Sequence, residues 1–453
     1  MTIDRRHFLA IAAGAAAAGA ILTPSRAATS LPGAGLDATH FGLRPGSPDD
    51  QSRVLQRAVD EAAHAQAPLV IPPGVYRAGN VKLPSGAKLV GVRGATRLVS
   101  SESNSLLWGA RADHVSLSGL VLDGQKRNLA DRHGLVHLEN ARGLRIVDCD
   151  IVGAGGVGLL CIAVDGEISG TTVAETADVA IRSLDARGLL ITRNTISGAG
   201  DNGIQVWREK AGDDGTIVTD NRIENIDNRS GGSGQYGNAI NAFRAANVIV
   251  RGNRIRNCAF SAVRGNTASN IQIDGNSISD AREVAIYSEF GFEGALIANN
   301  IIDRAAIGVS VTNFNEGGRL AAIQGNIVRN LLPKRPAGTD PGDGAGIGIY
   351  AEADTAITGN VVENAPYAGI VLGWGHYLRD VAATGNVVRR ADIGIGVSVA
   401  TGAGSALIAN NVIADVARGA IVGMDRGKLA TGDLIKGGAE RYANLTISGN
   451  RLR

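Results

Sequence analysis

The chain has 453 residues, and its 45 Lys and Arg against 43 Asp and Glu give a formal net charge of only +2. So balanced a charge argues against a nucleic-acid-binding protein, for which an extended basic surface is expected. Three dispersed cysteines (Cys149, Cys161 and Cys258) lack C-x-x-C spacing, which argues against a zinc or iron–sulfur site. We expect buried free thiols, with a Cys149–Cys161 disulfide as the alternative.

Residues 1–27 have the pattern of an export signal. Residues 4–9 (Asp-Arg-Arg-His-Phe-Leu) resemble a twin-arginine box, an apolar run follows to Leu22, and residues 25–27 (Ser-Arg-Ala) offer a small-x-small cleavage site. The run is too short and too rich in alanine for a transmembrane helix. We therefore expect export by the twin-arginine translocase and a periplasmic or secreted protein without a membrane anchor after cleavage. The alternative is an amphipathic N-terminal helix.

Residues 28–66 are predicted to form an N-terminal segment and a capping helix. Between Asp49 and Ala65 the apolar residues recur at helical spacing, with Ser47 or Asp49 as possible N-caps. Those apolar residues are Val54, Leu55, Ala58, Val59 and Ala62. Such a short amphipathic helix could cover the first strand edges of the structure that follows.

Residues 67–453 carry one repeated phrase: an aliphatic residue, two small or polar ones, an Asn, and an aliphatic two places on. It occurs ten times between Ile191 and Leu452, with degenerate copies that have Cys149 and Thr171 in the Asn place. The repeated residues are Asn194, Asn221, Asn253, Asn276, Asn300, Asn326, Asn360, Asn386, Asn411 and Asn450. They are 23 to 39 residues apart, and the flanking residues alternate as in strands.

Units of this length cannot bury an apolar face alone and must stack on one another. No L-x-x-L-x-L run suggests a leucine-rich repeat. The pattern predicts an all-β, single-stranded right-handed parallel β-helix of roughly 12 to 13 coils. The repeated Asn is expected at a turn, where Asn tolerates a left-handed backbone and stacked amides can form a ladder. At the far end, residues 424–442 could fold over the last coil; otherwise an oligomer would cover it.

The opening of the repeat region resembles a known superfamily. Residues 39–42 (Thr-His-Phe-Gly), the helix segment, and residues 71–76 (Ile-Pro-Pro-Gly-Val-Tyr) are similar to the start of pectate-lyase-like β-helix proteins. The chain also looks like twin-arginine-exported repeat proteins of this architecture. The resemblance covers residues 38–98 by motif and the remainder by repeat type. It implies the fold and polysaccharide as the ligand, but no particular reaction. The ordered acidic, G-H-G and R-x-K set of polygalacturonases is missing, which argues against hydrolysis of that type.

β-helix proteins usually act on the outer face of one sheet. Aligning the second strand of each coil, with its aliphatic residues inward, predicts which side chains form that face. Aromatic rings stack on sugars, and arginine matches uronate carboxylates. The expected substrate-binding residues are Arg182, Gln205, Trp207, Asn241, Phe243, Glu289, Tyr350, Glu352, Trp374 and His376. The alternative is that strands carry such residues outward for structural reasons alone.

For catalysis we considered a lyase or epimerase acting on uronates, which must stabilise the charge formed when the proton beside the carboxylate leaves. Arg208, Arg244 and Arg264 are the candidate stabilisers and Tyr287 the candidate base, with Lys210 or His376 as alternatives. Glu289, Glu293 and Glu352 could instead supply a hydrolase pair or bind Ca²⁺; no other cofactor or metal is expected. A non-catalytic carbohydrate-binding or cell-surface structural protein remains the alternative.

Overall fold

The computed structural model describes residues 35–130, 133–340 and 342–453. The predicted signal peptide lies outside these residues. Within them, no helix is both long enough and apolar enough to cross a membrane. Residues 36–453 form one unit.

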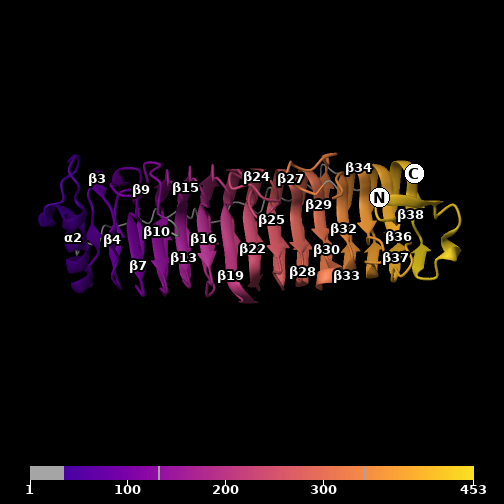
Figure 1. Cartoon of the computed structure of the whole chain (residues 1–453), viewed down its shortest axis with the longest axis horizontal. Helices are drawn as coiled ribbons and strands as arrows, with labels where there is room; N and C mark the ends of the chain where they lie inside the picture. The colour runs from indigo at the N-terminus through magenta and orange to yellow at the C-terminus, as the bar shows by residue number, and fades with distance from the viewer. Residues whose placement is uncertain (1–34, 131–132, 341) are drawn as a thin grey trace, which may run out of the picture. The chain divides into compact units, whose positions relative to one another are not determined.

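Strands stacked coil upon coil make up almost all of this unit (Figure 1). It is a parallel β-helix of about 14 turns, close to the predicted number. A typical coil contributes one strand to a 16-stranded sheet and two strands to a 25-stranded sheet, as with β23 (Ile249–Arg251), β24 (Arg254–Cys258) and β25 (Val263–Asn266). Aliphatic residues of every coil point inward and form one continuous core.

The last strand of each coil forms one outer face of the 25-stranded sheet. From residue 157 onward these strands are, in chain order, β13 (Val157–Ile162), β16 (Ile181–Leu184), β19 (Ile204–Asp213), β22 (Ile240–Ala246), β25, β27 (Ser277–Glu289), β29 (Ile301–Val311), β32 (Ile347–Ala351), β34 (Val361–Leu372), β36 (Val387–Ser398) and β38 (Val412–Asp425). From β27 onward most of these strands are longer, because they begin before the corner of the coil and continue through it. In earlier coils this corner is a turn between two separate strands, such as β24 and β25. Neighbouring strands pair in parallel and in register.

The predicted capping helix is α2 (Ser52–His64). It buries Leu55, Ala58, Val59 and Ala62 against the core. It contacts the strands of the first coils, which are β2 (Leu69–Val70), β3 (Gly74–Ala78), β4 (Val81–Lys82) and β5 (Lys88–Val90). The predicted N-caps were wrong. The helix begins at Ser52, too far along the chain for Ser47 or Asp49, and Asp50 accepts the backbone N–H of Ser52 at 3.0 Å.

The repeated asparagines form a buried ladder. Asn276 is typical: its side-chain amide donates to the Val250 carbonyl at 3.1 Å and to Oδ1 of Asn300 at 3.0 Å. The same pattern runs from Asn194 to Asn450 and therefore ties each coil to the next. One expectation was wrong. The left-handed residue is the one before the Asn, such as Gly252 or Asp220, because the turn bends there and leaves the amide pointing inward.

The three cysteines agree with the expectation of buried free thiols. All three thiols are free and buried, so the alternative disulfide is absent. Burial raises the pKa of Cys149 to about 11.

At the far end of the unit, after β38, the strand β39 (Lys428–Asp433) turns back antiparallel. Leu434 is buried behind it, and Tyr442 packs against the core. Residues 424–442 thus cover part of this end, whereas the last strand, β41 (Arg451–Leu452), is exposed, and an oligomer stays a prediction.

Candidate functional site

Two outward-facing columns contain most of the predicted site residues. The paired positions, coil by coil, are Arg182, Gln205, Asn241, Arg264, Tyr287, Ser310, Tyr350 and Val371. A second column two residues on contains Trp207, Phe243, Asn266 and Glu289. Parallel coils lie about 4.8 Å apart, so neighbours in a column are in reach of one another.

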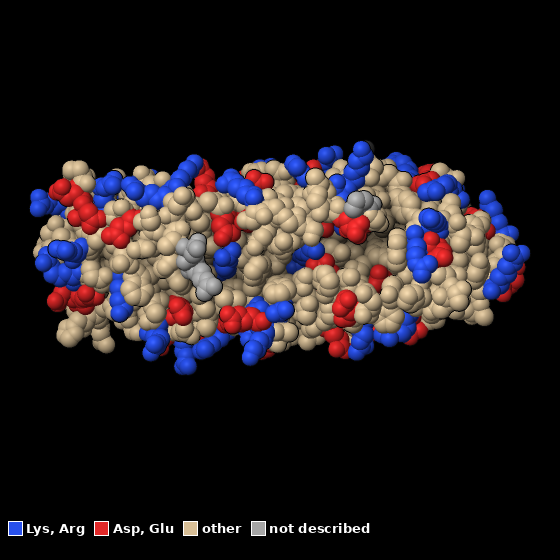
Figure 2. Space-filling view, viewed as in Figure 1, with Lys and Arg blue, Asp and Glu red and all other residues tan. Residues whose placement is uncertain are grey.

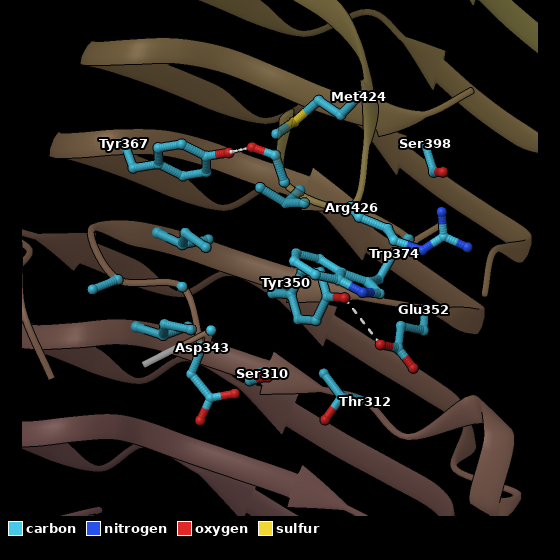
Figure 3. A pocket seen from close by; sticks show the side chains of 18 of the residues that line it. Ser310, Thr312, Asp343, Tyr350, Glu352, Tyr367, Trp374, Ser398, Met424 and Arg426 are labelled. Carbon is cyan, nitrogen blue, oxygen red and sulfur yellow. Dashed lines mark hydrogen bonds between the residues drawn. The ribbon is translucent and has the colours of Figure 1, made fainter. Parts of the chain in front are cut away.

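The structure opens a cleft over only the later part of this face. It has a volume of about 530 Å³ and lies over β27 to β38, with Arg335 and residues 342–345 forming one wall. Figure 2 shows this face hollowed, and Figure 3 shows the side chains inside. The polar and aromatic residues lining it are Tyr287, Ser310, Thr312, Asn313, Arg335, Asp343, Tyr350, Glu352, Tyr367, Trp374, Ser398 and Arg426.

Glu352 is the buried carboxyl group of the cleft. One of its oxygens accepts the Tyr350 hydroxyl at 2.9 Å, and the other accepts the Phe314 backbone N–H at 2.8 Å (Figure 3). Burial nevertheless raises the pKa of Glu352, because removing the charge from water outweighs these two hydrogen bonds. A carboxyl group of this kind keeps its proton to higher pH than an exposed one and is suited to donate it.

Three aromatic side chains line the same cleft as this carboxyl group. Tyr350 donates its hydroxyl to Glu352, Trp374 follows β34 and is 37% exposed, and the Tyr367 hydroxyl donates to the Gly427 carbonyl at 2.6 Å. In Figure 3 Tyr367 lies farther from Glu352 than Tyr350 does. Aromatic surface combined with a few fixed polar groups is the usual composition of a small-molecule or sugar site.

A buried charge network holds the wall of the cleft in place. The Arg264 guanidinium binds Glu289 through two hydrogen bonds of 2.7 and 2.9 Å and also contacts Glu283 at 3.2 Å. Arg335 joins Glu283 at 3.3 Å to Asp343 at 3.2 Å. The charge of Arg264 is therefore already neutralised by two carboxylates, and its guanidinium serves to anchor the wall.

The other predicted residues lie outside the cleft. Trp207 packs edge-on against Phe243 with ring centroids 5.7 Å apart and donates to Asn241 at 2.8 Å. Arg244 stacks over Phe243, 4.7 Å from the ring centroid, and donates to a backbone carbonyl. We call Gln205, Trp207, Asn241, Phe243 and Arg244 the upstream patch.

The remaining predicted residues are also separate from the cleft. Arg182 donates to Gln205 at 2.7 Å, beside the upstream patch. Arg208 lines a different hollow, 3.9 Å from Asp185 and from Asp214. His376 is exposed beside Tyr377 and is not among the residues that line the cleft. Of the predicted residues, the structure thus brings together Tyr287, Tyr350, Glu352 and Trp374.

Several cleft residues were missed by the sequence analysis. Ser310 and Thr312 occupy the two outward columns, so a complete alignment of the coils would have found them. Arg335 and Asp343 lie in a long insertion without periodicity, and no sequence signal places them. Among the described residues, no cluster of three or more His, Cys, Asp or Glu side chains could hold a metal ion, so the suggested Ca²⁺ gains no support from them.

Comparison with known proteins agrees with this architecture. Residues 209–388, less than half of the chain, match the family model described as a right handed beta helix region. No curated protein matches the sequence. PfbA, a surface adhesin of Streptococcus pneumoniae, is similar in structure with a TM-score of 0.52 and 15% identity, over 88% of this chain and 93% of that one.

A second similar structure is the catalytic unit of a GH87 alpha-1,3-glucanase from Streptomyces thermodiastaticus strain HF3-3. Its TM-score is 0.53 at 16% identity, over 94% of this chain and 70% of the other. At such low identity both likenesses concern the fold alone. Together with the strand pairing, they identify residues 36–453 as a right-handed parallel β-helix.

Proposed function

We propose that this is a polysaccharide-directed protein, and that the cleft over β27 to β38 binds a segment of a glycan chain. The observation that carries the proposal is that three aromatic rings line one cleft of about 530 Å³ together with carboxyl, hydroxyl and amide groups. Aromatic rings cover the apolar faces of sugars, while fixed polar groups bind their hydroxyls.

Two further points support the proposal. A glucanase catalytic unit and a surface adhesin share the fold, which is compatible with a glycan ligand without establishing one. The twin-arginine pattern of residues 4–9 supports export to the periplasm or the outside of the cell, where polysaccharides are found. The cleft also lies on rigid strands rather than on loops alone, which favours a preformed binding site.

The experiment is binding of the mature protein, beginning at Ala28, to a panel of alginate, pectate, hyaluronan and neutral glucans. Trp374 is exposed in the cleft, so a bound sugar should change its fluorescence. The Trp374→Phe variant should lose this signal, whereas Trp207→Phe in the upstream patch should keep it. Binding that leaves the signal of Trp374 unchanged would place the glycan elsewhere, and no binding across the panel would refute the proposal.

A catalytic form of this function is favoured by the raised pKa of Glu352. In a uronate lyase, a base takes the proton beside the carboxylate, the C4–O bond breaks, and an acid protonates the leaving oxygen. Glu352 is suited to be that acid, and the more exposed Asp343 to be the base. Burial raises the pKa of both Tyr287 and Tyr350, which makes either tyrosine a poor base at neutral pH. In an epimerase, the acid would return a proton to the sugar instead.

This form is tested by following the ultraviolet absorbance of unsaturated products, and by NMR of the polymer for newly formed uronate isomers. Glu352→Gln should abolish turnover while leaving the affinity for glycan within about threefold, since the amide keeps the shape of the carboxyl group. A flat absorbance trace and an unchanged polymer, with binding intact, would support the non-catalytic carbohydrate-binding protein instead.

A further inference from the structure

We propose a second binding site, for an anionic group carried by the same glycan, in a hollow that shares the Arg335 side chain with the cleft. The proposal rests on the proposed function. The hollow has a volume of about 460 Å³. Its lining residues are Asn257, Asp280, Arg282, Arg304, Leu332, Lys334, Arg335 and Pro336.

The charges of this hollow are strongly unbalanced. Four of its lining side chains are basic and only Asp280 is acidic. Asp280 is already bound by Arg304 at 2.6 Å. Within the described part of the chain, Arg282 and Lys334 have no carboxylate within ion-pair distance, and both are exposed. Two positive charges therefore face the hollow without a partner, and such a concave surface attracts anions.

The hollow is built on rigid backbone. Asn257, Asp280 and Arg304 occupy equivalent positions in three successive coils. Each directly precedes one of the three paired residues Cys258, Ala281 and Ala305. Each has a positive φ, between 54° and 68°, so a tight bend turns all three side chains to one side. Leu332 joins this corner through a hydrogen bond from its N–H to the Ala305 carbonyl at 2.8 Å. The backbone that carries Arg282, in β27, and Arg304, in β29, is thus in place before any ligand arrives.

Arg335 connects this hollow to the cleft, because its side chain lines both. Its guanidinium is fixed by Glu283 and Asp343, and Nε donates to the Gly344 carbonyl at 2.9 Å. The cleft itself contains two carboxyl groups, Asp343 and Glu352, and two guanidinium groups, Arg335 and Arg426, so its lining has no excess of positive charge. A glycan that crosses this wall would place its anionic substituent beside Arg282 and Lys334 instead.

The ligand group is therefore a planar or tetrahedral oxyanion on a polysaccharide. A uronate carboxylate and a sulfate ester both have this chemistry, and arginine can bind either one through two parallel hydrogen bonds. None of Arg208, Arg244 and Arg264, which the sequence suggested for this role, lines the hollow. The inference thus assigns the selection of acidic glycans to a different set of basic residues.

The test compares the Arg282→Ala/Lys334→Ala double variant with an Arg222→Ala/Arg254→Ala control, which removes the same charge from exposed positions outside both sites. Dissociation constants are measured for oligosaccharides of alginate, a sulfated galactan and a neutral glucan. We expect the double variant to lose at least tenfold in affinity for the carboxylated or the sulfated ligand. Binding of the neutral ligand and the melting temperature should not change, and the control should lose less than twofold.

The possible outcomes separate the two proposals. Equal losses in the double variant and the control would overturn the anion site, because general charge would then explain the attraction. Unchanged affinity of the double variant for both acidic ligands would overturn it too. Binding of only the neutral glucan would overturn the anion site and leave the proposed function standing. If no ligand binds the wild-type protein, the proposed function fails as well. The ligand that shows the loss identifies the group as carboxylate or sulfate.

Discussion

The upstream patch and the cleft lie on the same outward columns of the same sheet, yet only one of them is a cavity. In the upstream patch the side chains satisfy one another: Trp207 donates to Asn241, and Phe243 lies against both Trp207 and Arg244. In the cleft, the wall around Asp343 and the turn after β38 rise above the strands and leave space between them. Strand pattern alone therefore does not make a binding site; the insertions between strands do.

The largest expected difference between the two regions is in stability. Arg264→Ala would leave Glu283 and Glu289, each about 2% exposed, buried without their main partner. We expect this change to lower the free energy of unfolding by about 4 kcal/mol, as for other buried ion pairs that lose one partner. Arg244→Ala, at an exposed position of the upstream patch, should cost less than about 1 kcal/mol.

Urea denaturation followed by circular dichroism measures both variants. A loss of activity in Arg264→Ala must be interpreted with this result, since unfolding alone could cause it. Adding Glu283→Gln and Glu289→Gln to Arg264→Met should recover part of the stability. If Arg264→Ala costs no more than Arg244→Ala, the charge network does not hold the wall of the cleft.

The asparagine ladder offers the next largest difference. Asn276→Ala, within the ladder, would remove the acceptor for Asn253 and the donors to Val250 and Asn300. At about 1 kcal/mol for each buried group left unpaired, we expect a loss of about 3 kcal/mol. Thr171, the degenerate member before the ladder, donates its hydroxyl to the Ser169 carbonyl at 3.2 Å and accepts the Cys149 backbone N–H at the longer distance of 3.4 Å. Thr171→Ala should lower the free energy of unfolding by about 1 kcal/mol. If Asn276→Ala and Thr171→Ala lower it equally in the same denaturation assay, the ladder does not strengthen the later coils.

Affinity for glycan should separate the two regions more directly. Trp374→Ala removes an exposed ring from the cleft, and we expect it to weaken binding about 30-fold, or about 2 kcal/mol, as for other central aromatic contacts. Trp207→Ala should change the affinity less than about twofold, because the Trp207 ring already packs against Phe243 and its N–H already donates to Asn241. Isothermal titration calorimetry with the best ligand of the panel tests the pair. The reverse order of effects would move the binding site to the upstream patch.

The smallest expected effect is a pH dependence caused by Glu352. Its pKa in the folded protein lies above the ordinary value of 4.5, so between these two pKa values the folded state binds more protons than the unfolded state. Stability therefore falls as the pH rises through this window. Glu352→Gln should remove that part of the fall and raise the melting temperature at neutral pH. Glu209→Gln, an exposed control beside the upstream patch, should leave the profile unchanged; melting curves from pH 4 to 8 would show whether the two variants differ.

Much of the architecture could be predicted because repetition makes it a local property. The phrase around Asn276 recurs at the spacing of one coil, and the inward aliphatic residues identify the outward columns. Tyr287, Tyr350 and Glu352 were placed on the correct face for this reason. Arg335 and Asp343 could not be placed, since they belong to an insertion whose position depends on the distant Glu283.

The amino-acid sequence by itself determined the coil, the ladder, the capping helix and the face that the site would use. Each of these follows from the alternation of side chains along a strand and from the need of every coil to bury its apolar side on a neighbour. Only the tertiary structure decided which part of the face became a cleft. That choice depends on contacts between residues distant in sequence, such as Arg335 with Glu283 and Tyr367 with Gly427, which no local periodicity encodes.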